Sequence, residues 1–192
     1  MVRRQDLVGL LGRYISRPTR VCFRAMPRVL LVRHAHAIDD RAGLEDEARY
    51  LTSKGRRVTR EVAAKLAELG LVPTRILTSP LVRAVQTAEI LATIEAFEGP
   101  VEVHPPLTPG NPVALALAPL EDAGQHDLVF LVGHEPAMRA YAAHLLGVRR
   151  FPSFKKAGAC LVRLRADGAG SFEWMLVPKT LELVESIDEI EA

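Results

Sequence analysis

Three short, largely apolar runs, each leading directly into polar residues and then a helical pattern, constrain most strongly how this chain can fold. The runs are Val29–Val32, Arg75–Thr78 and Leu128–Val132. Short continuous apolar runs with β-branched residues are typical of strands buried on both faces of a parallel sheet. Strands that alternate with helices predict a three-layer α/β/α domain with a mostly parallel sheet.

The segments between and after these runs predict four helices. Ser79-Pro80 is typical of an N-cap followed by proline at the first helical position. Gly70 is expected to follow the end of the first helix as its C′ residue. The expected helices cover residues 56–69, 80–97, 112–119 and 136–147.

Further strands are expected at Val101–Val103 and in two late runs, Ala159–Leu164 and Phe172–Val177. The acidic segment from Glu182 is expected to be frayed or helical. The chain is therefore divided into a basic leader (1–25), one α/β domain (26–180) and an acidic C-terminal tail (181–192).

Charge separates the leader from the rest of the chain. Residues 1–28 hold seven arginines and one acid, whereas the remainder holds 18 basic and 22 acidic side chains. Nucleic-acid binding by the body is therefore not expected. The leader could be an amphipathic, transit-like or membrane-surface segment. We favour a dispensable extension, since Met26 directly precedes the first strand run and could itself be a start.

The cysteines and the hydropathy of the sequence indicate the compartment in which the protein is expected. Cys22 and Cys160 are far apart and fit neither a disulfide framework nor a zinc spacing, so a cytoplasmic setting is the default. No apolar stretch reaches the ~18–20 residues that would span a bilayer.

Two arginines and two histidines follow the predicted strands and should meet at one edge of the sheet, where α/β proteins bind ligands. They are Arg33, His34, Arg83 and His134. Arginine binds phosphate oxygens through a planar, permanently charged fork. An unprotonated histidine is a competent nucleophile at neutral pH. This combination predicts phosphoryl transfer through a covalent intermediate.

Four ordered motifs resemble the histidine phosphatase superfamily, and together they are highly specific. The motifs are Leu31–Ala35, Leu51–Gly55, Ser79–Ala88 and Leu131–Pro136. The short chain, Ala35 and the Gly-His-Glu-Pro segment are similar to the SixA-type phosphohistidine phosphatase branch. The resemblance implies a phosphoglycerate mutase-like fold and no metal or other cofactor. It also implies that His34 is phosphorylated, while Arg33, Arg83 and His134 hold the phosphoryl oxygens.

The general acid departs from the family pattern. Larger relatives carry a glutamate well after the second arginine, near an inserted lid, and here that region is short. The candidates are Glu102, His104, Asp39 and Glu135, and none matches a motif well. A phosphohistidine leaving group needs little help from an acid.

Some polar residues have more ordinary interpretations. His36 forms a His-x-His pair with His34 that could bind a metal, but a loop histidine is favoured. Gln86 and Thr87 are expected to pack or bond locally. Lys155-Lys156 is interpreted as a solvated turn, with docking of acidic partner proteins as the alternative.

The sequence therefore predicts a metal-independent phosphatase that acts on phosphohistidine of a protein, for example a phosphotransfer domain. The absence of room for a lid favours an open site that a protein side chain can reach. A phosphatase for small phosphomonoesters is the rival within the enzyme class. The other rivals are a phosphate-binding or phosphoprotein-docking module without turnover and a metal-dependent hydrolase that uses His34 and His36.

Overall fold

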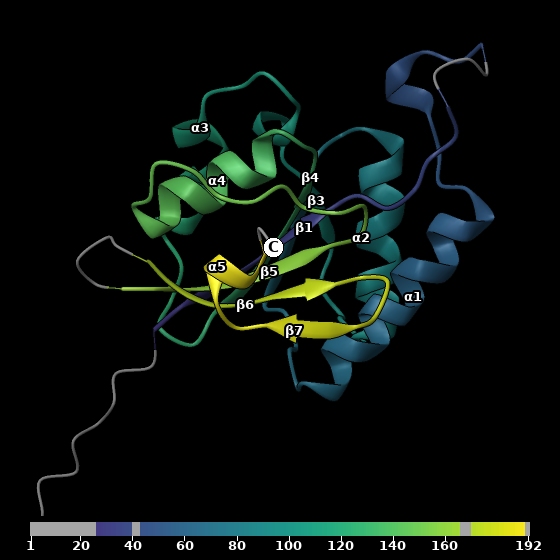
Figure 1. The fold of residues 1–192 in the computed structure, drawn as a ribbon. Helices are drawn as coiled ribbons and strands as arrows, with labels where there is room; N and C mark the ends of the chain where they lie inside the picture. Colours follow the sequence, from purple (N-terminus) through teal and green to yellow (C-terminus); the bar gives the residue numbers. More distant parts are fainter. Residues whose placement is uncertain (1–25, 40–42, 166–169, 191–192) are drawn as a thin grey trace, which may run out of the picture.

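A seven-stranded mixed sheet forms the centre of the molecule in the computed structural model, which describes residues 26–39, 43–165 and 170–190 (Figure 1). The strand order is β3-β2-β4-β1-β5-β6-β7. The four strands from β3 to β1 are parallel, and β5, β6 and β7 continue the sheet in antiparallel pairs. The strands are β1 (Arg28–Arg33), β2 (Arg75–Thr78), β3 (Val101–Val103), β4 (Leu128–Gly133), β5 (Ala159–Leu164), β6 (Gly170–Val177) and β7 (Glu182–Val184).

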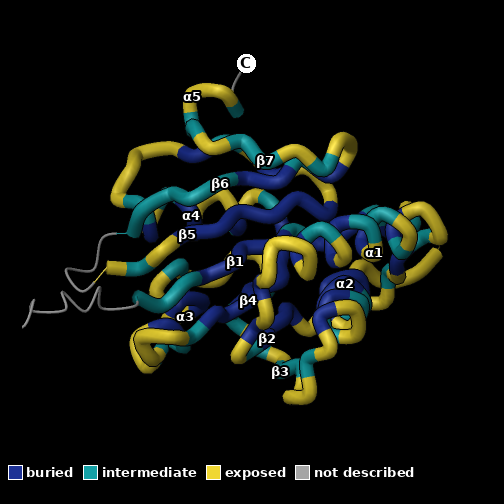
Figure 2. Tube along the Cα trace, turned by 90° about the horizontal axis from the view of Figure 1, so that it is seen from below, coloured by how far each residue is buried: buried dark blue, intermediate teal, exposed yellow. Residues whose placement is uncertain are grey.

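Helices cover both faces of the sheet. Helices α1 and α2 lie on one face, and α3 and α4 lie on the other (Figures 1 and 2). The helices are α1 (Ser53–Glu68), α2 (Val82–Ile94), α3 (Val113–Leu117), α4 (Ala137–Leu146) and α5 (Ile187–Ile190). Short 3-10 helices are η2 (Asp46–Ala48), η3 (Pro105–Leu107) and η4 (Ala118–Leu120).

The central strands are buried on both faces because successive side chains point to opposite sides. Leu30 and Val32 of β1 pack into the core under α1 and α2, whereas Val29 and Leu31 pack into the core under α3 and α4. Every residue of β4 is buried. Figure 2 shows this pattern as buried strands in the middle of the sheet and more exposed strands at its two edges.

The predicted three-layer α/β fold is confirmed, with parallel pairing confined to the four strands from β3 to β1. Two local predictions are wrong. Helix α2 begins at Val82 and ends at Ile94, so Ser79 and Pro80 precede it. Ser79 Oγ accepts from the amide of Leu81 at 3.4 Å and also lies 2.8 Å from His134 Nε2. Glu182–Val184 forms an edge strand, because its backbone pairs with β6. The leader and residues 166–169 lie outside the described residues.

Glycines mark two places where the backbone tolerates little else. Gly70 follows α1 with φ +68°, as expected for a C′ residue. A Cβ on Gly55 would lie 2.1 Å from the carbonyl oxygen of His36, so only glycine allows this approach. The start of α1 is thereby packed against the segment that follows β1.

Glu95, directly after α2, is a buried carboxyl side chain with 5% of its surface exposed. Its Oε1 has no hydrogen-bond partner within the described residues. Burial raises the pKa of Glu95 from 4.5 to about 7. The folded protein therefore holds this proton up to about pH 7, whereas the unfolded chain releases it near pH 4.5.

Glu95→Gln should therefore stabilise the protein above neutral pH. Since the folded state binds more protons, the native stability falls as pH rises from about 4.5 to 7. The variant removes that loss and should raise the free energy of unfolding by about 1–3 kcal/mol at pH 8, with little change at pH 4. Urea unfolding at several pH values measures the effect, with the exposed Glu98→Gln as control. The prediction would be contradicted if the free energy of unfolding depended on pH in the same way for wild type and Glu95→Gln.

Candidate active site

The structure brings together the four side chains that the sequence predicts at the carboxyl ends of the strands. Arg33 is the last residue of β1, His34 follows it, and His134 follows β4. The two strands are adjacent and parallel, and the amide of His34 donates to the carbonyl of Gly133 at 2.9 Å. The imidazole centroids of His34 and His134 are 4.9 Å apart. Arg83, the second residue of α2, completes the group.

His34 is held as a neutral imidazole, and no hydrogen bond engages its Nε2 among the described residues. Its Nδ1 lies 2.7 Å from the carbonyl oxygen of Ala35. A carbonyl only accepts, so Nδ1 carries the proton and Nε2 keeps its lone pair. Burial lowers the pKa of His34 to about 4, and the charges of Arg83 and Arg33 act in the same direction. At neutral pH the imidazole is therefore already in the unprotonated form that a histidine nucleophile requires.

His134 is also neutral and has one nitrogen available. Its Nε2 is 2.8 Å from Ser79 Oγ. Burial, followed by the nearby charges of His34 and Arg83, lowers the pKa of His134 to about 3. Its Nδ1 is buried and has no hydrogen-bond partner among the described residues. A ligand oxygen could use this second nitrogen.

Arg33 is fixed by the segment after α4. Its Nη1 donates to the carbonyl of Phe154 at 2.6 Å, while the amide of Phe154 donates to Glu135 Oε1 at 2.9 Å. The buried Nε of Arg33 has no partner in the part of the chain that the structure describes. Arg33 thus keeps donor capacity at the site, and its backbone clamp was not predicted from the sequence.

Arg83 is engaged by Asp46, a second contact that sequence reasoning missed. Its Nη1 donates to the backbone carbonyl of Asp46 at 2.6 Å, and its Nη2 donates to Asp46 Oδ2 at 2.9 Å. The hydrogen bond from Arg83 is the main reason that the pKa of Asp46 lies below its usual value. Asp46 is followed by Arg49 at i+3, but nothing in the sequence places this turn against α2.

The remaining motif residues hold the backbone around these side chains. Thr87 Oγ1 accepts from the amide of Ala35 at 3.2 Å and donates to the carbonyl of Arg83 at 2.7 Å. Gln86 Oε1 accepts from the amide of Leu51 at 2.8 Å. Only the bond from Thr87 to Arg83 is local, as expected; the bonds to Ala35 and Leu51 instead join α2 to segments far away along the chain.

His36 and Thr52 connect the segment after β1 to α1. Thr52 Oγ1 lies 3.1 Å from His36 Nδ1 and accepts from the amide of Gly55 at 3.0 Å, which caps α1. Within residues 26–39, 43–165 and 170–190, no group of three or more His, Cys, Asp or Glu side chains could hold a metal ion.

Three of the four candidate general acids are engaged by other groups, and the fourth, Asp39, is exposed. Glu102 receives two hydrogen bonds from Arg75, at 3.1 and 2.9 Å, near the start of β2. His104 Nε2 is 3.2 Å from the carbonyl of Leu115, and Asp39 is exposed. Glu135 binds the Phe154 amide, and burial raises its pKa. No hydrogen bond joins any of these four to His34 or His134 among the described residues.

Comparisons with known proteins show the family to which the chain belongs. A profile of the histidine phosphatase superfamily (branch 1) matches residues 29–108. The phosphohistidine phosphatase SixA of Escherichia coli (strain K12) is 30% identical over 162 residues, which cover 83% of this chain and 99% of SixA. The chain belongs to the histidine phosphatase superfamily.

Two further relatives support this membership. A solved structure of the protein histidine phosphatase SixA complexed with tungstate has a TM-score of 0.73 and 31% identity, covering 81% of this chain and 99% of that one. An uncharacterised protein of Picosynechococcus sp. is 40% identical over 141 residues, which cover 71% of this chain and 84% of the relative. As a histidine phosphatase family member, the protein is a phosphatase with the phosphoglycerate mutase-like fold.

None of the helices described for this histidine phosphatase family member is long and apolar enough to cross a membrane.

Proposed function

We propose that this phosphatase transfers a phosphoryl group from phosphohistidine of a protein to His34 Nε2 and then to water. The observation that carries the proposal is the neutral His34, whose Nδ1–H is fixed by a carbonyl and whose Nε2 is free. Two arginines and a second histidine with an available nitrogen surround it.

In the first step, His34 Nε2 forms a bond to phosphorus as the bond between phosphorus and the substrate nitrogen breaks. A phosphohistidine whose second ring nitrogen carries a proton leaves as neutral imidazole. In the second step, water attacks phosphorus, the bond to Nε2 breaks, and one water proton goes to solvent as phosphate departs. His34 ends as it began, with a free Nε2.

Arg33, Arg83 and His134 would stabilise the charge on the phosphoryl oxygens in both steps. Arginine forks suit a dianionic group and remain charged throughout. Binding of tungstate, a tetrahedral oxyanion, by the related SixA supports an oxyanion site of this kind. Binding at fixed donors lowers the barrier because they need little reorganisation.

None of the candidate general acids is hydrogen-bonded to His34 or His134 among the described residues, which supports phosphohistidine as the substrate. Asp46 is the carboxylate that acts electrostatically on His134, and Arg83 keeps its pKa low. Asp46 is therefore ionised at neutral pH and has no proton to donate. An alkyl phosphate expels an alkoxide that must be protonated, and a positioned acid is typically worth about 10²–10⁴-fold.

We expect kcat/KM to be highest for a histidine-phosphorylated phosphotransfer domain, intermediate for an aryl phosphate and lowest for a sugar phosphate. The order follows how much protonation each leaving group needs. All three substrates are compared on one preparation of the full chain, and His34→Ala controls for contaminating phosphatases. A sugar phosphate that is the best of the three would favour a small-molecule phosphomonoesterase instead.

A further inference from the structure

Five positively charged side chains line one pocket beside the candidate active site. The pocket has a volume of about 560 Å³ and lies where α1, the segment after α4 and the end of β6 meet. Its charged lining residues are Lys54, Arg57, Lys155, Lys156 and Lys179, with Glu61 as the carboxylate. We call this site the basic pocket.

The basic pocket includes a residue close to His34 in the chain. His36, two residues further along the chain, lines it. After burial, the charges of Lys156 and Lys54 lower the pKa of His36, and Lys156 also acts on His34. The amide of Ala157 donates to the carbonyl of His34 at 3.3 Å. An anion in the pocket would therefore lie close to a phosphoryl group on His34.

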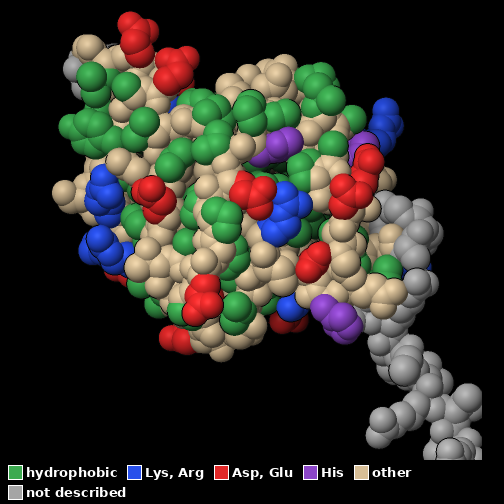
Figure 3. Space-filling view, turned by 180° about the vertical axis from the view of Figure 1, so that it is seen from behind, with side chains coloured by type: hydrophobic (Ala, Val, Ile, Leu, Met, Phe, Trp, Pro, Cys, Tyr) green, Lys and Arg blue, Asp and Glu red, His purple; other side chains and the backbone are tan. Residues whose placement is uncertain are grey.

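The positive charge of the pocket is largely uncompensated. Glu61 is held by Arg57 at 2.6 Å, so this pair is neutral. No ion pair engages Lys54, Lys155, Lys156 or Lys179 within the described residues. By contrast, acidic and basic side chains are scattered over the face shown in Figure 3. Four like charges around one cavity repel one another and attract an anionic partner.

The start of α1 carries positive charge where helices disfavour it. The first turn contains Lys54 and Arg56 and no acidic residue. The helix dipole places partial positive charge at this end, so each cation there is unfavourable for the helix. A local arrangement that opposes stability is expected at sites where the charge serves binding.

We propose that the basic pocket binds acidic side chains that flank the phosphohistidine of the protein substrate. This inference rests on the proposed function. The chemistry favours a protein over a small anion because four of the five cations are lysines, and none of the five is buried. Solvated lysines on separate segments steer and dock a charged surface, whereas small-molecule pockets use a few buried, fixed polar groups.

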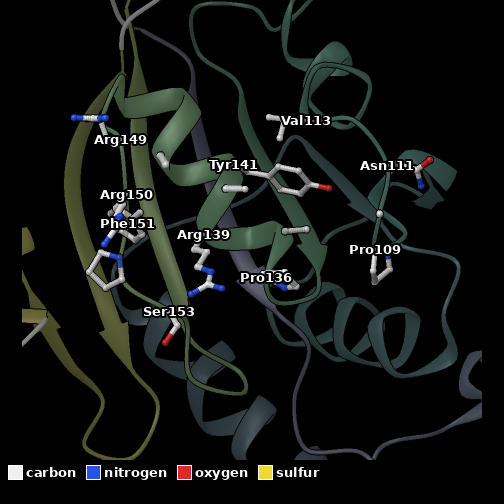
Figure 4. A pocket seen from close by; sticks show the side chains of 15 residues that line it. Pro109, Asn111, Val113, Pro136, Arg139, Tyr141, Arg149, Arg150, Phe151 and Ser153 are labelled. Atoms are coloured by element: carbon white, nitrogen blue, oxygen red, sulfur yellow. The ribbon is translucent and has the colours of Figure 1, made fainter.

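A second groove supplies a comparison surface. It runs along α4 and is flanked by Arg139, Arg149 and Arg150 (Figure 4). Arg139 is paired with Glu135 at 3.5 Å. None of the residues whose charges shift the pKa of His34 lines this groove, so we expect it to matter less for substrate docking.

Two peptides that differ only in flanking charge test the proposal. One carries four glutamates beside phosphohistidine, and the other carries four glutamines. We expect kcat/KM to be about tenfold higher for the glutamate peptide at low salt and the ratio to approach one at high salt. Equal values for both peptides at low salt would overturn the proposal.

A triple variant tests whether the preference for the glutamate peptide depends on the basic pocket. Lys54→Gln, Lys155→Gln and Lys179→Gln together should reduce the glutamate-to-glutamine ratio to about one and leave aryl phosphate hydrolysis within about twofold. Lys156 is kept because its charge acts on His34. Arg60→Gln, Arg149→Gln and Arg150→Gln remove as many exposed charges elsewhere and should preserve the ratio. If the preference for the glutamate peptide disappeared in this control and persisted in the lysine variant, the substrate would dock at the groove along α4 and the proposal would be wrong.

The design separates failure of the pocket from failure of the proposed function. If neither phosphopeptide is hydrolysed, the affinity of the unphosphorylated glutamate peptide still reports on the pocket. The wild-type protein should bind it at least about tenfold more tightly than the glutamine peptide at low salt. The triple lysine variant should show no such preference. Equal affinities would contradict the pocket. Removing Lys54 relieves an unfavourable helix charge, so thermal melting should show no destabilisation that could explain the loss.

Discussion

Replacing His34 with alanine should abolish turnover, with a loss of at least about 10³-fold in kcat. In the proposed mechanism the variant removes the nitrogen that accepts the phosphoryl group, and the surrounding arginines cannot supply another nucleophile. The acid-labile phosphoenzyme, trapped with radiolabelled substrate, should disappear as well. Near-normal turnover in His34→Ala would rule out the covalent route through this residue.

His144→Ala is the matched control for that experiment. His144 is an exposed histidine on α4, and its removal should change kcat less than about twofold. Thermal melting of both variants checks folding. The imidazole of His34 is buried, so a modest loss of stability is expected, but both proteins should remain folded at the assay temperature.

The proposed nucleophile, His34, is also expected to set the lowest pH at which the enzyme is active. Because burial lowers the pKa of His34 to about 4, the neutral imidazole persists well below pH 6. The rate should therefore fall only as pH approaches about 4, once the ionisation of the substrate itself is corrected for. An aryl phosphate suits this measurement since phosphohistidine is unstable in acid.

Much of the site could be predicted from the sequence because its residues follow strands of unmistakable pattern. The apolar run Val29–Val32 places Arg33 and His34 at the end of β1, and Leu128–Val132 does the same for His134. Parallel pairing then brings these residues together without knowledge of any loop. The paired strands β1 and β4 thus account for three of the four side chains.

Contacts that depend on how loops close could not be predicted. Asp46 reaches Arg83 through a single 3-10 turn, and Phe154 offers Arg33 a backbone carbonyl, which no side-chain pattern reveals. Ser79-Pro80 has the usual sequence of a helix start, yet Ser79 pairs with His134. Local propensity was overridden there by a contact from another strand.

The edge strand β7 shows a related limit. Glu182–Val184 is short and begins with a charged residue, so its pattern alone does not distinguish strand from tail. What orders it is the backbone of β6, to which residues Leu183 and Val184 are paired. Pairing of this kind depends on a neighbour in space and leaves little trace in the sequence.

Arg83→Lys should reduce kcat/KM about 10²–10³-fold, although the charge is retained. A planar fork can bind two phosphoryl oxygens, whereas a lysine ammonium is a point charge that cannot reproduce both contacts. The side chain of Arg83 is buried, which strengthens its electrostatic effect on bound phosphoryl oxygens. Inhibition by vanadate should weaken by at least about tenfold in the same variant.

Arg49→Lys is the control for Arg83→Lys, because Arg49 also contacts Asp46 but through its other carboxylate oxygen, Oδ1. We expect less than a threefold change in kcat/KM for Arg49→Lys. The comparison matters because Asp46 engages the Arg83 fork that we assign to phosphate. Phosphoryl oxygens must share the guanidinium with Asp46 or displace it. If Arg83→Lys and Arg49→Lys had equal, small effects, Arg83 would serve mainly to hold Asp46 and the phosphate clamp would lie elsewhere.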